Sequence, residues 1–206
     1  MFESLTALQS ALWIKEPTDF VSHYLFERIP FAFSDDLDNW IMWKSHLATK
    51  LDVDPRNIVL TGSGAIGFSL NPTKSFKAFD ETSDIDCGVI SPHHFDLAWR
   101  YLRQLEPSWL SLPPESKRAI RTHRTRYVFS GTIATDSILA LLPFGLSWQN
   151  ALDTMSKTNP TVGRDVKLRI YKDYDALRHY QARGIQRLRI NLSTADSNGS
   201  DIGTEN

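Results

Sequence analysis

Hydrophobic positions in the first fifty residues recur at the spacing of amphipathic helices. Residues 2–23 carry apolar side chains at loose helical intervals, and Pro17 limits the first helix. A clearer one-sided stripe follows Ser34-Asp35-Asp36, which offers a capping residue and early acids. The stripe consists of Leu37, Trp40, Ile41, Leu47 and Leu51. The pattern therefore predicts a helical N-terminal segment, 1–52, that ends in a helix over about 35–51.

Short apolar runs of the kind that form buried strands begin after residue 53. Residues 57–61 stop at Gly62, which is typical of a buried strand that ends in a tight turn. Residues 85–90 form a second such run, and 166–171 alternate as a half-buried strand does. Two further stretches, one strand-like and one an apolar run closed by a proline, are 127–133 and 138–142.

Helical patterns fill the intervals between these runs. Residues 95–105 place apolar side chains on one side, and an arginine-rich helix is predicted at about 174–190. Beyond it, 191–206 are small and polar, which predicts a disordered tail. We therefore expect a single α/β (α+β) domain over 1–190, a mixed β-sheet flanked by helices, with its core at about 53–172.

Composition is that of an ordinary globular protein. The 206 residues are 41% hydrophobic and 11% aromatic, with a formal net charge of −1, so any anionic partner must be held by a local patch. The single cysteine, Cys87, excludes an internal disulfide and a multi-cysteine zinc site. No apolar run is long enough to span a bilayer, and the N-terminus lacks the pattern of a secretion signal. We expect a cytoplasmic protein without a membrane partner.

A glycine-rich turn follows the first predicted strand, with the pattern Gly62-Ser63-x-x-x-Gly67-x-Ser69. Glycine lets the main chain take up φ > 0 and approach a polyphosphate closely. Successive backbone N–H groups and a serine hydroxyl can then bind anionic oxygens. These four residues are the predicted nucleotide-binding set, although most glycine-rich turns are simply turns.

Two acids stand at the start of the second predicted strand. Residues two apart in a strand point to the same face, so Asp84 and Asp86 are expected side by side, with Ile85 turned to the opposite layer. Two neighbouring carboxylates repel, and a Mg²⁺ ion between them and a substrate's phosphates removes the conflict. The alternative is a pair of solvated surface acids.

Together and in this order, the glycine turn and the Ser83-Asp84-Ile85-Asp86 sequence resemble the DNA polymerase β-like nucleotidyltransferase superfamily, in the branch that reads GS-x-x-x-G-[ST] and later SDID. The resemblance covers residues 57–91. It implies transfer of a nucleoside monophosphate from an NTP, such as ATP, to a hydroxyl, with two Mg²⁺ ions (or Mn²⁺) held by three acids. The spacing between the motifs is longer than in the smallest members. We assign the extra length to a loop over 71–82, whose Lys74 and Lys77 either reach phosphates or are plain surface charges.

The third acid implied by the resemblance should follow on a neighbouring strand. Asp136 occupies about the right place in the order of elements and completes the expected catalytic and metal-binding set of Asp84, Asp86 and Asp136. Asp136 would equally suit the N-cap of a helix that starts at Ser137. Asp153 and Asp165 are lesser candidates.

Cations gather in two stretches that could bind a triphosphate or a nucleic-acid backbone, or be solvated helix faces. The first runs from Lys117 to Arg126 and includes His123. The second lies on the predicted last helix and consists of Arg178, Arg183, Arg187 and Arg189, with Tyr180 placed to stack on a base or to pack.

The leading hypothesis is a Mg²⁺-dependent nucleotidyltransferase whose acceptor is RNA, a protein, a nucleotide or a small molecule. Members of this branch serve in bacterial phage defence and toxin–antitoxin pairs, so the resemblance also implies an antiviral or toxin–antitoxin setting with a protein partner from the same operon. The alternative is a catalytically inactive nucleotide- or nucleic-acid-binding module that acts as a subunit or regulator. A missing third acid would favour that alternative.

Overall fold

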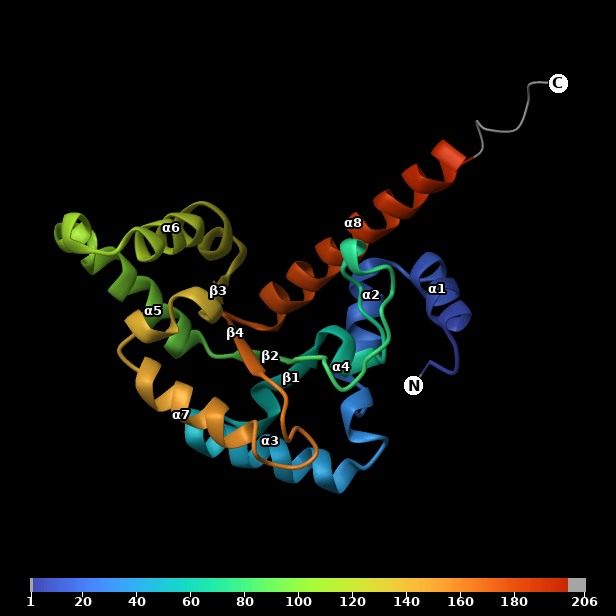
Figure 1. The fold of residues 1–206 in the computed structure, drawn as a ribbon, viewed down its shortest axis with the longest axis horizontal. Helices are drawn as coiled ribbons and strands as arrows, with labels where there is room; N and C mark the ends of the chain where they lie inside the picture. The colour runs from blue at the N-terminus through green and yellow to red at the C-terminus, as the bar shows by residue number, and fades with distance from the viewer. Residues whose placement is uncertain (1, 200–206) are drawn as a thin grey trace.

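A four-stranded mixed sheet with the strand order β1-β2-β4-β3 lies at the centre of the protein (Figure 1). The computed structural model describes residues 2–199, without the side chains of 106–108 and 195–199. The strands are β1 (Ile58–Thr61), β2 (Ile85–Ile90), β3 (Thr132–Ala134) and β4 (Val166–Tyr171). β2 pairs with β1 in antiparallel and with β4 in parallel orientation, and β3 pairs with β4 in antiparallel orientation. The expected α/β fold is confirmed.

Helices cover both faces of this sheet. They are α1 (Leu5–Ile14), α2 (Pro17–Val21), α3 (Leu37–Leu51), α4 (Gly62–Ile66), α5 (Pro92–Gln104), α6 (Pro114–Thr122), α7 (Gly145–Met155) and α8 (Tyr174–Gly199). Shorter 3₁₀ turns are η2 (Phe31–Phe33), η3 (Pro55–Asn57), η4 (Pro72–Lys74), η5 (Glu106–Ser111), η7 (Val128–Ser130), η8 (Thr135–Ser137) and η9 (Leu139–Leu141), and η1 (Ser22–Phe26) and η6 (His123–Tyr127) are π-helical. Among the described residues no helix is both long and apolar enough to cross a membrane.

The two faces of the central strand pair have different characters. Ile85, Cys87 and Val89 of β2 are buried, as are their register partners on β4, so this face forms the main core with α3, α5 and α7. The opposite face carries Asp86 and Gly88, and α8 packs over its Gly88 end. A Cβ atom on Gly88 would lie 2.7 Å from Leu177 of α8, so glycine is needed for this close approach. Asp86 is consequently left open beyond the edge of α8.

The segment expected as a strand over 127–133 is mostly helical. His123 is fully buried in the π-helix η6, where Nδ1 lies 2.7 Å from the Ala119 carbonyl oxygen. Nε2 lies 2.8 Å from the Ala134 carbonyl oxygen and 3.1 Å from the Ala134 amide nitrogen. This side chain ties η6 to β3 and shortens the strand to Thr132–Ala134. The chain turns at Gly131, where φ is +63° and a Cβ would lie 2.8 Å from that of Ala176.

Two other expectations differ from the structure. The apolar run 138–142 forms the 3₁₀ turn η9, which buries Ile138, Leu139 and Leu142 without any strand pairing. The last helix does not end near residue 190, because α8 continues to Gly199 and Leu192 packs against the core. Residues 191–199, expected to be disordered, are therefore helical, and 200–206 lie outside the described residues.

Candidate functional site

The glycine at the end of β1 lies directly against the second acid of the predicted pair. The antiparallel register places Thr61 opposite Asp86, and Gly62 follows with φ of +65°. A Cβ atom at position 62 would lie 2.8 Å from Oδ2 of Asp86. Only glycine allows this conformation beside a carboxylate without displacing it. The two motifs, separate in the sequence, thus meet at one point of the fold.

The four residues of the predicted nucleotide-binding set do not all reach that point. Gly62 and Ser63 begin the short helix α4, and Gly62 lies beside Asp86. Gly67 ends the helix with φ of +90°, and a Cβ there would lie 2.9 Å from the Phe31 ring. The Ser69 amide donates to the Lys77 carbonyl in the following loop. Gly67 and Ser69 therefore shape the far end of α4, away from the carboxylates.

Charged side chains in the loop before β2 pair with neighbours in the same loop. The Lys77 ammonium lies 3.0 Å from the Asp80 carboxylate and donates to the Thr82 hydroxyl at 2.8 Å. Hydrogen bonds from Thr82 and Lys77 lower the pKa of Asp80, so this ion pair persists in mild acid. Lys77 is engaged within the loop, which supports its interpretation as a surface charge. The guanidinium of Arg164 donates to the Ser83 carbonyl at 2.9 Å and holds the chain in place just before Asp84.

A lysine from the neighbouring strand neutralises the first acid. Asp84 immediately precedes β2, and its Oδ2 accepts a hydrogen bond from Nζ of Lys167 at 2.5 Å. Lys167 stands on β4, where the parallel register makes it the partner of Asp86. The hydrogen bond to Asp84 raises the pKa of Lys167, which therefore remains a cation at neutral pH. Lys167, Asp84 and Asp86 therefore lie on one face of the sheet.

Asp86 is the least compensated acid of the group. Partial removal of water around its carboxyl raises its pKa, and repulsion from Asp84 raises it further. Lys167 and Arg169 pull the pKa down, whereas Asp136 adds to the upward shift. The surroundings of Asp86 therefore favour its protonated form over its carboxylate form. Such a group is suited to bind an added cation or to take up a proton.

Asp136 approaches the same place from β3. It lies within η8, directly after the strand, and its side chain caps no helix, so the N-cap alternative is not realised. The Thr135 hydroxyl donates to the Leu168 carbonyl at 2.5 Å and fixes η8 against β4. Asp136 is 53% exposed, and its Oδ2 lies 3.9 Å from Nη2 of Arg169. Arg169 is therefore the residue that connects this third acid to the other charged side chains of the site.

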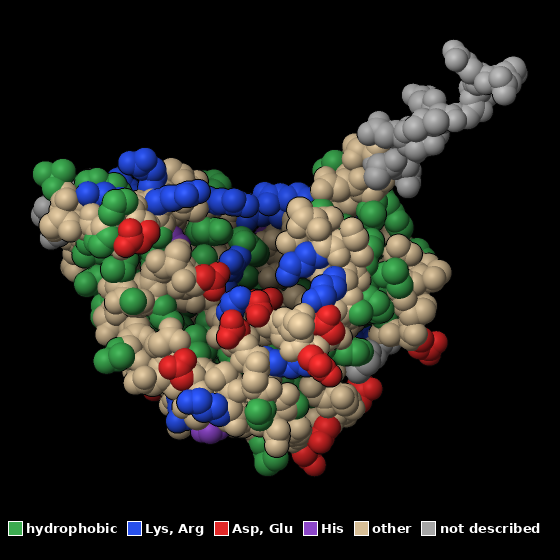
Figure 2. All heavy atoms as spheres, viewed as in Figure 1, with side chains coloured by type: hydrophobic (Ala, Val, Ile, Leu, Met, Phe, Trp, Pro, Cys, Tyr) green, Lys and Arg blue, Asp and Glu red, His purple; other side chains and the backbone are tan. Residues whose placement is uncertain are grey.

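Asp86, Asp136 and the two cations of β4 line a hollow of about 230 Å³ in the surface, whereas Asp84 is joined to it through Lys167. Its walls are formed by Thr61, Gly62, Asp86, Asp136, Lys167, Arg169, Tyr171, Tyr180 and Gln181, together with Cys87 and Leu168. Acidic side chains gather in the hollowed centre of the face shown in Figure 2, with cations beside them. Cys87 points into the core, and burial raises the pKa of its thiol, so it remains a neutral thiol.

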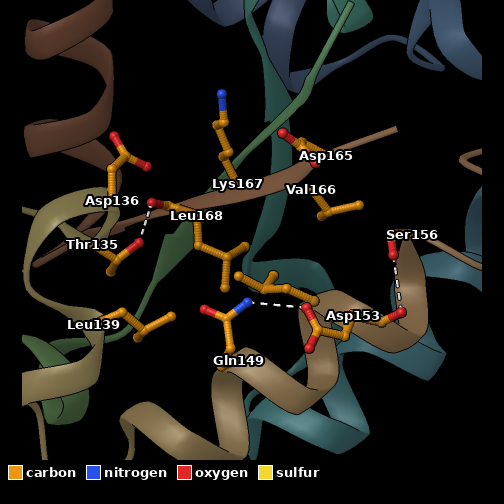
Figure 3. A pocket seen from close by; sticks show the side chains of 11 residues that line it. Thr135, Asp136, Leu139, Gln149, Asp153, Ser156, Asp165, Val166, Lys167 and Leu168 are labelled. Carbon is orange, nitrogen blue, oxygen red and sulfur yellow. Dashed lines mark hydrogen bonds between the residues drawn. The ribbon is translucent and has the colours of Figure 1, made fainter. Parts of the chain in front are cut away.

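A second hollow, of about 300 Å³, adjoins the first and shares Asp136 and Lys167 with it (Figure 3). Gln149 and Asp153 of α7 lie on its opposite side, joined by a hydrogen bond of 3.0 Å. Asp165, the other lesser candidate from the sequence, lies at its upper edge. Asp153 and Asp165 thus belong to an adjoining space.

The fit of this site to Mg²⁺ is partial. Asp84 and Asp86 are hard oxygen ligands close enough to raise the pKa of Asp86, which fits the two-carboxylate half of a magnesium site. Lys167 already forms an ion pair with Asp84, and Arg169 lies 3.9 Å from Asp136. Among the side chains that the structure describes, no three from His, Cys, Asp or Glu are arranged to hold a metal ion. An ion could enter with a phosphate ligand once Lys167 leaves Asp84.

Sequence reasoning missed the two cations of β4. Lys167 and Arg169 alternate with Val166, Leu168 and Ile170 and therefore share a face of the strand. The alternation was visible in the sequence. Which strand lies beside β4 was not, because the pairing with β2 joins residues that are far apart in the chain. Comparison with protein-family models, with curated proteins and with solved structures finds no match to this chain.

Proposed function

We propose that this protein is a nucleotidyltransferase that transfers a nucleoside monophosphate from an NTP to a hydroxyl acceptor. The observation that carries the proposal is the contact between Gly62 and Asp86, which places main chain without a side chain directly beside a carboxylate. Lys167 and Arg169 line the same hollow. A site for a magnesium-bound polyphosphate needs these three components: approachable backbone, carboxylates and cations.

Each residue has a role in the proposed reaction. The main chain at Gly62 and Ser63 receives the phosphates, and Arg169 offsets their negative charge. Lys167 exchanges its bond to Asp84 for one to a phosphate oxygen, which frees Asp84 and Asp86 to hold Mg²⁺. The bound ion supplies charge neutralisation at the phosphates. The acceptor oxygen forms a bond to the α-phosphorus, the bond from that phosphorus to the β-bridging oxygen breaks, and pyrophosphate leaves. The acceptor's proton passes to a carboxylate of the hollow.

The test is pyrophosphate release from each of the four NTPs with Mg²⁺ or Mn²⁺, compared between wild type and Asp84→Ala/Asp86→Ala. We expect the double substitution to reduce the rate at least 100-fold, because it removes both proposed ligands of the metal. Asp96→Ala is the matched control, since Asp96 is a partly exposed acid on α5 paired with Arg100 outside the hollow. Release that the double variant leaves unchanged would refute the proposal for this site.

A second function is favoured by the ion pair of Lys167 and Asp84. If the lysine never leaves, the hollow has a permanent cation where a metal would be needed, and the protein binds a nucleotide without turning it over. Titration calorimetry separates the two functions. ATP binding of similar strength with and without Mg²⁺, and no pyrophosphate release, would support the inactive module. Binding that requires the metal and is followed by release would support the enzyme.

A further inference from the structure

A basic groove of about 320 Å³ runs beside the candidate hollow, between α8 and the η6–η7 segment. Its main lining residues are Arg126, Phe129, Tyr180, Arg183, Gly184 and Arg187. Figure 2 shows a band of Lys and Arg side chains along the rim of the hollow, from the α6 end of the molecule to α8. The formal net charge of the chain is only −1, so this band is a local concentration of positive charge.

The arginines of the groove are available to a ligand. Arg126, Arg183 and Arg187 are exposed, and none forms a salt bridge within the part of the chain that the structure describes. Two of them lie near aromatic rings: Arg126 is 5.6 Å from the Tyr127 ring centroid, and Arg183 is 5.9 Å from that of Tyr180. Three cations along one groove suit a ligand with several negative charges better than a single small anion.

An aromatic side chain projects into the same groove without a packing role. Phe129 is 91% exposed, although burial of a phenylalanine ring normally contributes a few kcal/mol. An exposed ring beside arginines offers a stacking surface for an unpaired base. A base inside a duplex could not use that surface, because both of its faces are already stacked.

Gly184 gives an independent indication that something approaches α8 closely. It lies in the interior of the helix, where glycine costs about 1 kcal/mol relative to alanine. A Cβ at this position would meet no atom within 4 Å, so no described part of the protein requires the glycine. Gly184 faces the groove between Arg183 and Arg187. A ligand pressed against the helix would account for the missing side chain.

The groove and the hollow share one lining residue. Tyr180 lines both spaces, and its hydroxyl accepts a hydrogen bond from the guanidinium of Arg169. Arg169 also lies 4.8 Å from the centroid of the Tyr180 ring and 3.9 Å from Asp136. Arginine and tyrosine side chains therefore line the surface from Arg187 in the groove to Asp136 in the hollow.

We propose that this groove binds a single-stranded nucleic acid whose end enters the hollow as the hydroxyl acceptor. The arginines contact the phosphates, Phe129 stacks on a base, and the backbone of the strand passes over Gly184. Identification of the strand as the acceptor rests on the proposed nucleotidyltransferase function, whereas its binding to the groove does not.

Binding is tested by fluorescence anisotropy with fluorescein-labelled 12-nucleotide oligouridine and oligothymidine on the full chain. We expect Arg183→Gln/Arg187→Gln to weaken binding at least tenfold and to flatten its salt dependence, because each lost phosphate contact releases fewer counterions. Phe129→Ala should weaken binding about tenfold through the loss of stacking. Lys15→Gln/Lys50→Gln, which removes two cations outside the groove, is the control and should bind as wild type does.

Gly184→Ala separates a ligand contact from a structural role. Alanine should leave the melting temperature unchanged or raise it, because of its higher helix propensity, and should still weaken strand binding several-fold. Wild-type affinity in the arginine and Phe129 variants would overturn the proposal. Equal affinity for a glutamate peptide of the same charge would also overturn it, since that would indicate an acidic protein partner.

The acceptor role has its own readout. Extension of the unlabelled strand by a labelled nucleotide, lost in Arg183→Gln/Arg187→Gln, would support the full proposal. Strand binding without pyrophosphate release from any NTP would refute the enzyme and leave the groove in place. Pyrophosphate release without strand binding would refute the proposal for the groove and leave the enzyme in place.

Discussion

Nζ of Lys167 lies 2.5 Å from Oδ2 of Asp84, so a cation from β4 holds one of the two acids on which the proposed metal site depends. The pair is partly exposed and contributes little to stability. Under the proposed function, the pair matters instead for ligand binding. A metal ion and this ammonium group compete for the same carboxylate, and a phosphate ligand offers the lysine another partner.

Substitution of Lys167 should therefore strengthen metal binding by the free protein. In Lys167→Gln, Asp84 and Asp86 lose their shared cation, and Mg²⁺ becomes the best available counter-charge. We expect a larger rise of melting temperature on addition of Mg²⁺ than in wild type, measured by differential scanning fluorimetry, with weaker ATP binding. Lys157→Gln, on the exposed surface after α7, is the control. An unchanged response to Mg²⁺ would indicate that the carboxylates do not form a metal site.

Asp86→Asn should stabilise the folded protein at neutral pH. The pKa of Asp86 is raised in the folded state, so its charged form destabilises the fold relative to the unfolded chain. The penalty is absent below the ordinary carboxyl pKa of 3.8, grows as the pH rises toward the folded pKa, and is complete above it. Each kcal/mol relieved should raise the melting temperature by about 2–4 °C. Calorimetry at pH 7 and in acid measures the difference, and an equal gain at both pH values would contradict this electrostatic explanation.

Gly62→Ala should impair function far more than stability. Alanine with φ of +65° costs about 1–2 kcal/mol, and its methyl group would displace the Asp86 carboxylate. We expect loss of pyrophosphate release with a modest fall in melting temperature. Gly64→Ala is a matched control on the same helix, because its Cβ would meet Phe79 at an ordinary contact distance of 3.5 Å. Equal effects of the two substitutions would argue against a special role for Gly62.

His123 should make the protein less stable in weak acid. Burial lowers the pKa of its imidazole below 6.5 and outweighs the backbone hydrogen bonds at Ala119 and Ala134, which favour the protonated form. The neutral form therefore stabilises the fold fully above the unfolded pKa, and stability falls as the pH drops through 6.5. Urea unfolding between pH 7.5 and 5 should show this loss. His123→Gln should reduce the slope, whereas His46→Gln, on an exposed part of α3, should retain it.

Local pattern sufficed for much of the fold. The helix predicted over 35–51 corresponds to α3, although Leu37 and Ile41 of its predicted stripe are exposed. The apolar runs at 57–61, 85–90 and 166–171 correspond to β1, β2 and β4 within a residue. These elements are specified by hydrophobic spacing alone. The 127–133 segment was missed because a buried histidine, which contacts backbone groups eleven positions away, overrides its strand-like composition.

The sequence predicted only those residues of the candidate site that belong to recognisable motifs. Gly62 and Asp86 each carried a recognisable signal, and the β1–β2 register brings them together. The contributions of Lys167 and Arg169 depend on the pairing of β2 with β4, which no local pattern encodes. The opposition of Lys167 to Asp84 changes the expected three-acid site into an ion-paired one.

The parallel pairing of β2 with β4 also has a consequence for the way this chain folds. Ile85 pairs with Val166, which lies far along the chain from it. Contacts so distant in sequence slow folding, because closing a large loop costs conformational entropy. During synthesis, β2 leaves the ribosome well before its partner does. The acid on β2 and the cations on β4 can face one another only once β4 has been synthesised and paired, so chains that end before β4 lack the hollow.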